Sequence, residues 1–180
     1  FIFYEETTMH SLVKVTVNKD GIPTWLKAKQ QWVCWVVGKE KAGGKFDKIP
    51  VNPESGIYVD GTNPENWLSF EEAIGFYERE RCAGIGFALS KEPFDVDESG
   101  NLYLVALDFD NCVDRSDEIK AIWKSLNKPY AEISPSGRGM RMFALSRELI
   151  SGGNDGVGHE MYTSGRFMTV TGNVIRGCHA

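Results

Sequence analysis

Two aspartates end the apolar stretch that decides the fold, Leu104-Val105-Ala106-Leu107-Asp108-Phe109-Asp110. A β-strand has a side-chain period of two, so Asp108 and Asp110 share one face of the predicted strand. Carboxylates at the end of a buried strand carry a high desolvation cost unless a cation lies between them. A divalent metal meets this need, because carboxylate oxygens are hard ligands for Mg²⁺ or Mn²⁺. The alternative is a polar strand end that runs into a loop, and the Asp-x-Asp pattern alone leaves both interpretations open.

The composition is typical of a globular protein with one domain. The chain has 180 residues and a formal net charge of −5 at pH 7, which disfavours a protein that coats nucleic acid through bulk positive charge. Its four cysteines are scattered, so we expect neither a zinc site nor a disulfide framework. The sequence has no long apolar run and no secretory signal pattern, so we expect a cytoplasmic protein with no membrane partner.

The order of predicted elements indicates an α+β fold. Ser69 and Glu72 have the spacing of a capping box and predict the start of a helix. The acidic segment 92–100 predicts a solvated turn. The other predicted elements are strands at 32–37, 83–89 and 104–110, extended chain at 48–53, helices at 24–30 and 116–126, and hairpins around 134–145 and 160–171.

A second segment has the composition of a turn that binds phosphate, Ser134-Pro135-Ser136-Gly137-Arg138-Gly139-Met140-Arg141. Backbone amides of a glycine turn, hydroxyl groups and guanidinium groups are all donors to an anion. An ordinary turn with surface arginines is the alternative. The candidate donors are Ser134, Ser136, Gly137, Arg138, Gly139 and Arg141.

A third segment contributes another carboxylate, Glu160, followed by a turn at 163–165 and a predicted returning strand that begins at Arg166. If the strand of Glu160 neighbours the Asp-x-Asp strand, Glu160 becomes a third metal ligand. The alternative is a surface ion pair with Arg166, worth roughly a few tenths of a kcal/mol. Glu132 also allows two interpretations, as an auxiliary acid or as part of a charge pair across a hairpin.

These segments, in this order, resemble the N-terminal domain of bifunctional DNA primase-polymerases of the archaeo-eukaryotic primase superfamily, the type encoded by plasmids and phages. Further segments upstream are similar to the same family, so the resemblance spans roughly residues 25–172. The matching segments are Ala106-Leu107-Asp108-Phe109-Asp110, residues 132–139, Glu160-Met161-Tyr162 with residues 165–172, and the upstream segments 31–35, 48–53, 66–73 and 84–87.

The resemblance implies a catalytic core with a mixed sheet related to the RNA-recognition-motif fold, packed with an N-terminal α/β unit. Residues 24–180 would form the primase-polymerase domain, and residues 1–23 an N-terminal extension. The implied activity is template-dependent nucleotidyl transfer in replication of a plasmid, phage or other mobile element. The implied partners are a DNA template and primer, a dNTP or NTP, and a helicase domain or protein.

Carried over residue by residue, the resemblance makes Asp108, Asp110 and Glu160 the catalytic ligands of two Mg²⁺ or Mn²⁺ ions. Ser136 and its neighbours become the triphosphate site. Because Asp108 would be a metal ligand, we expect Asp108→Ala to abolish primer extension and to leave the metal-free melting temperature equal or higher.

This chain has Arg141 where the family usually has histidine. Arginine binds phosphate bidentately, but it exchanges no proton near neutral pH. Together with Arg138 and Arg166, it would neutralise the triphosphate. Lys45 and Lys48 are candidate contacts to template phosphates, with solvated turn lysines as the alternative.

Two other functions use the same features. A metal-dependent phosphodiesterase would use the three carboxylates to cleave strands, but the phosphate-binding turn favours the use of a triphosphate. A non-catalytic replication initiator or single-strand-binding module would keep the fold without the chemistry. The acidic net charge and Arg141 favour this last interpretation, whereas the three carboxylates oppose it.

Overall fold

A computed structural model describes residues 14–41, 45–112, 116–154 and 158–175. These residues form two β-sheets and three short α-helices, so the predicted α+β class is confirmed. The predicted mixed sheet is instead antiparallel in every pairing between described strands. The helices are α1 (Thr24–Lys27), α2 (Phe70–Glu78) and α3 (Ser116–Ser125), with 3-10 turns at Lys19–Gly21 and Pro64–Asn66.

The first sheet has four strands in the order β10-β3-β1-β2. It corresponds to the predicted N-terminal α/β unit, because β1, β2 and β3 enclose α2 in the sequence. Its last strand comes from the far end of the chain. The bounds are β1 Trp32–Lys41, β2 Lys45–Val51, β3 Gly84–Ala88 and β10 Phe167–Val170.

The second sheet has six strands, ordered β6-β7-β5-β9-β8 with β4 paired to β5. The predicted strand with the two aspartates is the central strand, β5, which is consistent with its apolar composition. The bounds are β4 Asp95–Asp97, β5 Gly100–Phe109, β6 Tyr130–Ile133, β7 Met140–Ser146, β8 Gly153–Asn154 and β9 His159–Tyr162.

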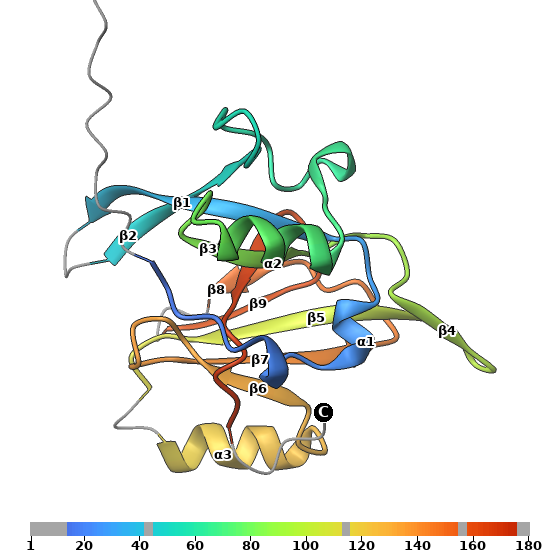
Figure 1. Ribbon diagram of the computed structural model, residues 1–180. Helices are drawn as coiled ribbons and strands as arrows, with labels where there is room; N and C mark the ends of the chain where they lie inside the picture. Colours follow the sequence, from blue (N-terminus) through green and yellow to red (C-terminus); the bar gives the residue numbers. More distant parts are fainter. Residues whose placement is uncertain (1–13, 42–44, 113–115, 155–157, 176–180) are drawn as a thin grey trace, which may run out of the picture.

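The two faces of the six-stranded sheet pack against different partners (Figure 1). Leu107 and Phe109 of β5 lie in a small core with Ile119 and Trp123 of α3. Leu104 and Ala106, on the other face, join the main core. That core also contains side chains from the four-stranded sheet, α1 and α2. Asp108 shares this second face, so its side chain lies at the end of the surface that meets the rest of the molecule.

Three local predictions can be compared with the structure. The capping box of Ser69 and Glu72 is present and begins α2. The acidic segment 92–100 is not a simple turn, because β4 forms a hairpin with the start of β5. The predicted hairpin at 160–171 is wrong, because β9 pairs with β5 in one sheet and β10 pairs with β3 in the other. The chain therefore crosses between the sheets at residues 163–166.

The segment before residue 24 contacts the rest of the chain. Ile22 is buried in the main core, and the amide of Asn18 donates to the carbonyl of Thr171 at 2.7 Å. The boundary between an extension and a catalytic domain at residue 24 stays a prediction. Among the described segments, no helix has the length and apolar character needed to cross a bilayer.

Candidate functional site

Four charged residues form a row across the six-stranded sheet. The strand register places Glu132 opposite Arg141, Arg141 opposite Asp108, and Asp108 opposite Glu160. Directly opposite residues of an antiparallel pair project from the same face, with Cβ atoms about 4.5–5.5 Å apart. The prediction that the strand of Glu160 neighbours the Asp-x-Asp strand is therefore confirmed. Residues from three predicted motifs meet in this row.

Arg141 is buried and is bound to Asp108. Its Nε donates to Asp108 Oδ1 at 3.1 Å, and its Nη2 approaches Oδ2 at 3.4 Å. Its Nη1 donates to the carbonyl oxygen of Thr169 on β10, at 3.0 Å. The side chain of Arg141 is 8% exposed, against 17% for Asp108. The guanidinium group thus links both sheets and does not extend toward solvent as a triphosphate ligand would.

Glu160 is paired with a different arginine. Arg166 Nη1 donates to Glu160 Oε2 at 3.1 Å, and this pair is more exposed than the first. The guanidinium carbon of Arg166 also lies 3.3 Å from the centre of the Tyr162 ring, a cation–π contact. The predicted ion pair is present, although Glu160 lies on β9 of one sheet and Arg166 directly precedes β10 of the other. Arg166 therefore neutralises the carboxylate that stands opposite Asp108, and the role of Glu160 as a metal ligand stays a prediction.

Asp110 lies beyond the end of β5, beside the start of β9. Its amide donates to the carbonyl of Gly158 at 2.9 Å, two residues before Glu160. The three predicted acidic residues therefore share one end of the β5–β9 pair. Directly opposed like charges such as Asp108 and Glu160 repel each other unless a cation neutralises them. In this structure, Arg141 and Arg166 provide that neutralisation.

The donor chemistry suits Mg²⁺ or Mn²⁺, because all three candidates are carboxylates. Within the described residues, however, no group of three or more His, Cys, Asp or Glu side chains is arranged to hold a metal ion. Asp108 and Glu160 are the two carboxylates that the register brings together. To bind an ion with both, the side chains of Arg141 and Arg166 must release them. The three-ligand site stays a prediction.

The turn between β6 and β7 is held together by its own hydrogen bonds. Ser134 Oγ accepts from the amide of Gly139 at 3.0 Å, and Ser136 Oγ accepts from the amide of Arg138 at 3.3 Å. The amide of Gly137 donates to the carbonyl of Ser134 at 2.9 Å. Three amides predicted to face a phosphate are thus already used. The side chains of Ser136 and Arg138 are exposed, and the Ser136 hydroxyl also shares a hydrogen bond of 3.1 Å with Ser134 Oγ.

Gly139 sets how closely this turn approaches the site. A Cβ atom there would lie 2.6 Å from the carbonyl oxygen of Phe109, at the end of β5. Any side chain would push the turn away from the aspartates. The glycine predicted as a phosphate donor therefore has a packing role as well.

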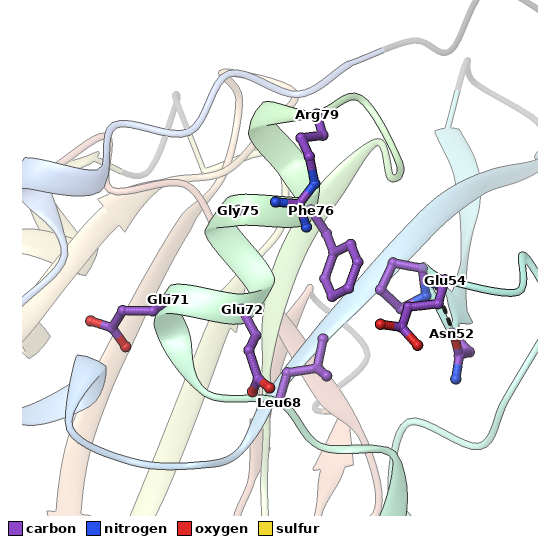
Figure 2. A pocket seen from close by; sticks show the side chains of 9 residues that line it. Asn52, Glu54, Leu68, Glu71, Glu72, Gly75, Phe76 and Arg79 are labelled. Atoms are coloured by element: carbon purple, nitrogen blue, oxygen red, sulfur yellow. Dashed lines mark hydrogen bonds between the residues drawn. The ribbon is translucent and has the colours of Figure 1, made fainter.

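The predicted template contacts lie away from this row. Lys45 and Lys48 belong to β2, whereas β10 forms the opposite edge of the same sheet and receives Arg141. The ammonium of Lys48 lies 5.9 Å from the centre of the Trp35 ring. A groove of about 530 Å³ lies between α2 and residues 52–54 (Figure 2), and no predicted site residue lines it.

Sequence reasoning assigned no role to Tyr162. Its ring stacks on Arg166, and burial raises the pKa of its hydroxyl, with the charges of Glu160 and Asp108 acting in the same direction. The spacing in the sequence could have indicated such a role, because Tyr162 lies two residues after Glu160 and therefore on the same face of β9. Only the pairing of β9 with β5 places it at the site.

Comparison with known proteins gives one informative match. No protein-family model matches the chain. It is 32% identical over 163 residues to a protein of Nitratiruptor phage NrS-1 named DNA primase-polymerase, a match that covers 84% of this chain. The chain is similar to a phage-type primase-polymerase domain. This confirms the resemblance inferred from the motifs. The aligned region is 21% of the phage protein, so the chain spans about a fifth of this relative.

Proposed function

We propose that this chain is a nucleotidyl-transfer domain of primase-polymerase type that extends a DNA primer along a template. The proposal rests on one observation above the others, the row in which Asp108 and Glu160 stand opposite each other with an arginine at each carboxylate. Two acidic groups and two guanidinium groups in one place suit a reaction between a polyanionic nucleotide and metal ions. The match to the phage protein supports the same conclusion.

Asp108, Asp110 and Glu160 would hold two divalent ions. Such ions, when bound, assist attack by the primer 3′-hydroxyl and stabilise the pyrophosphate leaving group. The chain itself supplies cations for the substrate. The side chain of Arg166 is partly exposed to solvent, so its guanidinium can leave Glu160 and bind the triphosphate bidentately.

Ser136 and Arg138 would form the outer part of the triphosphate site. Both are exposed on the turn that Gly139 holds against the end of β5. Arg141 lies deeper, where it fixes Asp108 and the neighbouring sheet. We assign it to holding the carboxylate in place and not to first contact with the nucleotide.

Primer extension tests this function directly. The protein is incubated with Mn²⁺, labelled deoxynucleotides or ribonucleotides, and either a primed or an unprimed template. Template-directed lengthening of the primer is the expected result, and shortening of a labelled strand would instead indicate a phosphodiesterase. Asp108→Asn is the matched control, because it keeps the shape of the side chain and removes the charge.

One observation favours a second candidate, a non-catalytic DNA-binding module. Both oxygens of Asp108 are already engaged by Arg141, so the row is neutralised without a metal. In that case the protein would bind single-stranded DNA but extend no primer with Mg²⁺ or Mn²⁺. Gel-shift titration of the same labelled template separates the two candidates.

A further inference from the structure

Glu132 is a fully buried carboxylate that the proposed reaction does not use. Its side chain is 0% exposed, and it lies in the charged row opposite Arg141. An isolated carboxylate in such a place costs several kcal/mol unless donors surround it. Three donors do so here, through four hydrogen bonds. Of the two interpretations from the sequence, the charge pair across a hairpin is the closer one, because Glu132 stands opposite Arg141, whose charge acts on it. The carboxylate is nevertheless buried, and its hydrogen bonds come from other residues.

The donors come mainly from the chain that follows β10. Oε2 of Glu132 accepts from the amides of Thr171 and Gly172, each at 2.9 Å. Oε1 also accepts from Thr171, at 3.1 Å, and the hydroxyl of Tyr130 donates to Oε2 at 2.8 Å. The positive charge of Arg141 acts on the same carboxylate. A single carboxylate thus binds two consecutive amides of the segment that follows the other sheet's edge strand.

The backbone conformation of Gly172 makes this contact possible. Its φ is +66°, and a Cβ atom there would lie 1.9 Å from the carbonyl oxygen of Asn18. The chain therefore turns at Gly172 in a conformation that favours glycine and presents its amide to Glu132. The hydroxyl of Thr171 adds another link between the sheets, since it donates to the carbonyl of Ile133 at 3.3 Å.

Arg141 binds the same strand one step earlier. Its Nη1 donates to the carbonyl of Thr169, two residues before the first amide that Glu132 binds. Glu132 and Arg141 are direct neighbours on β6 and β7. Together they attach the end of β10 to the six-stranded sheet, one through its carbonyl and the other through its amides.

Arg166 depends on this attachment. Its carbonyl oxygen accepts from the amide of Leu89 directly beyond the β3–β10 pair, so its backbone is held beside the four-stranded sheet. Its guanidinium nevertheless reaches Glu160 of the six-stranded sheet. The distance between the sheets therefore decides where the guanidinium lies relative to the carboxylates.

We propose that Glu132 is a positioning residue, which holds the end of β10 against the six-stranded sheet and thereby places Arg166 at the nucleotide site. This inference rests on the proposed function for its catalytic consequence. The anchoring contact itself does not depend on that function. Glu132 exchanges no proton with substrate in this role, so its shape and its acceptor oxygen matter more than its acidity.

Two substitutions separate anchoring from acid catalysis. Glu132→Gln keeps an oxygen at the position of Oε2, where it accepts the same three donors. Glu132→Asp is one methylene shorter and withdraws the carboxylate from Thr171 and Gly172. Glu148→Asp makes the same change at an exposed position after β7 and serves as the matched control.

The first measurement is independent of catalysis. Hydrogen exchange of the amides of Thr171 and Gly172, followed by NMR, should accelerate at least about tenfold in Glu132→Asp and change little in Glu132→Gln. Unchanged exchange in Glu132→Asp would overturn the anchoring contact. A wild-type protein that extends no primer would count against the proposed function, and the exchange measurement would still test the anchor.

The second measurement is primer extension with varied nucleotide. Displacing Arg166 weakens nucleotide binding, so the KM for nucleotide should rise about tenfold in Glu132→Asp with a smaller change in kcat. Glu132→Gln and Glu148→Asp should stay within about threefold of the wild type. The contrary outcome is that Glu132→Gln loses as much activity as Glu132→Asp while its Thr171 and Gly172 amides stay protected from exchange. That result would overturn the positioning role in favour of acid catalysis. If Glu132→Asp fails to fold, Tyr130→Phe replaces it, since it removes one donor from the same carboxylate and should raise KM about threefold.

Discussion

Arg141 and Asp108 stand directly opposite each other on β7 and β5, and Arg141 binds both oxygens of the carboxylate from a buried position. A guanidinium group is always charged and presents a planar set of donors, so it suits this bidentate contact. The same group reaches Thr169 on the other sheet. The residue expected to bind a triphosphate therefore has a structural role in this chain, and this relationship changes the expected effect of several substitutions.

Removal of Asp108 should destabilise the protein. Asp108→Ala leaves the buried guanidinium of Arg141 without its carboxylate, which typically costs roughly 3 kcal/mol in the free energy of unfolding. Urea denaturation without metal measures this change. The expectation from the sequence, an equal or higher melting temperature, has the opposite sign because it treats Asp108 as a metal ligand alone and omits its contact with Arg141.

Asp97 provides the comparison for this prediction. Arg147 binds Asp97 bidentately at 2.7 and 2.6 Å, but both side chains are exposed. Exposed pairs contribute little to stability even when their geometry is good. Asp97→Ala should therefore shift the urea midpoint far less than Asp108→Ala. Equal shifts would mean that burial of Arg141 does not determine the effect.

A histidine at position 141 should make stability depend on pH. Beside the carboxylate of Asp108, the imidazolium form of Arg141→His is favoured, so its pKa should lie above the usual value of about 6.5. Its stabilising contribution is complete below that value and is lost as pH rises through the folded-state pKa. The melting temperature of Arg141→His should thus fall relative to wild type between about pH 6 and 8. A constant difference across this range would show that the imidazole does not pair with Asp108.

Glu132 should produce a pH dependence of its own. Burial raises its pKa above the ordinary value of 4.5, while the amides of Thr171 and Gly172, the hydroxyl of Tyr130 and the charge of Arg141 act in the opposite direction. The folded state therefore retains a proton that the unfolded state has released. Its contribution to stability is complete below pH 4.5 and decreases as pH rises through the folded-state pKa.

Glu132→Gln has no proton to lose at this position. Its free energy of unfolding should increase relative to wild type as pH rises from about 4 toward neutrality. Chemical denaturation at several pH values measures the difference. A difference that shrinks with rising pH would show that the donors outweigh burial and that the pKa is lowered.

The sequence predicts those parts of the fold that depend on local patterns. Alternation of side chains in 104–110 identifies the central strand and its two faces. Ser69 and Glu72 predict the start of α2, because a capping box involves four consecutive residues. The turn after Tyr162 looks like a hairpin for the same local reason. It crosses between sheets because β10 finds its partner in β3, about 80 residues earlier, a pairing that local composition does not reveal.

The residues of the candidate site differ in the same way, because local patterns predict the position of some and only long-range pairing gives the position of others. The sequence alone could suggest that Asp108 and Glu160 lie together, because this requires only one assumed pairing between two strands. The role of Arg141 depends on the register of β7 against β5 and on the contact with Thr169. The role of Glu132 depends on the backbone of Gly172, which follows β10 of the other sheet. Long-range register and a positive φ leave no local signature in the sequence.

Ser134 and Ser136 should behave differently despite their similar positions in the turn. Ser134 Oγ is the acceptor for the buried amide of Gly139, so Ser134→Ala should lower the free energy of unfolding by about 1–3 kcal/mol. Ser136 is exposed, so Ser136→Ala should leave stability nearly unchanged and raise the nucleotide KM. Thermal unfolding and primer extension measure the two effects. A stability loss confined to Ser136→Ala would contradict the hydrogen bonding of this turn.

Arg141 of the charged row and Arg166, which pairs with its end at Glu160, should separate binding from stability. Arg166 is 40% exposed and pairs with Glu160 at the surface, so Arg166→Ala should change the free energy of unfolding by less than about 1 kcal/mol. If Arg166 binds the triphosphate, its loss should raise the nucleotide KM at least about tenfold, because a bidentate guanidinium contact to phosphate is lost.

Arg141→Ala should instead lower stability strongly and change the nucleotide KM less. It leaves Asp108 without its counter-ion and the carbonyl of Thr169 without its donor, so the melting temperature should fall strongly. Primer extension at a temperature where both variants are folded, with nucleotide varied, distinguishes the roles. A larger increase in KM in Arg141→Ala than in Arg166→Ala would contradict this assignment. It would show that Arg141 binds the triphosphate and leaves Asp108 when nucleotide binds.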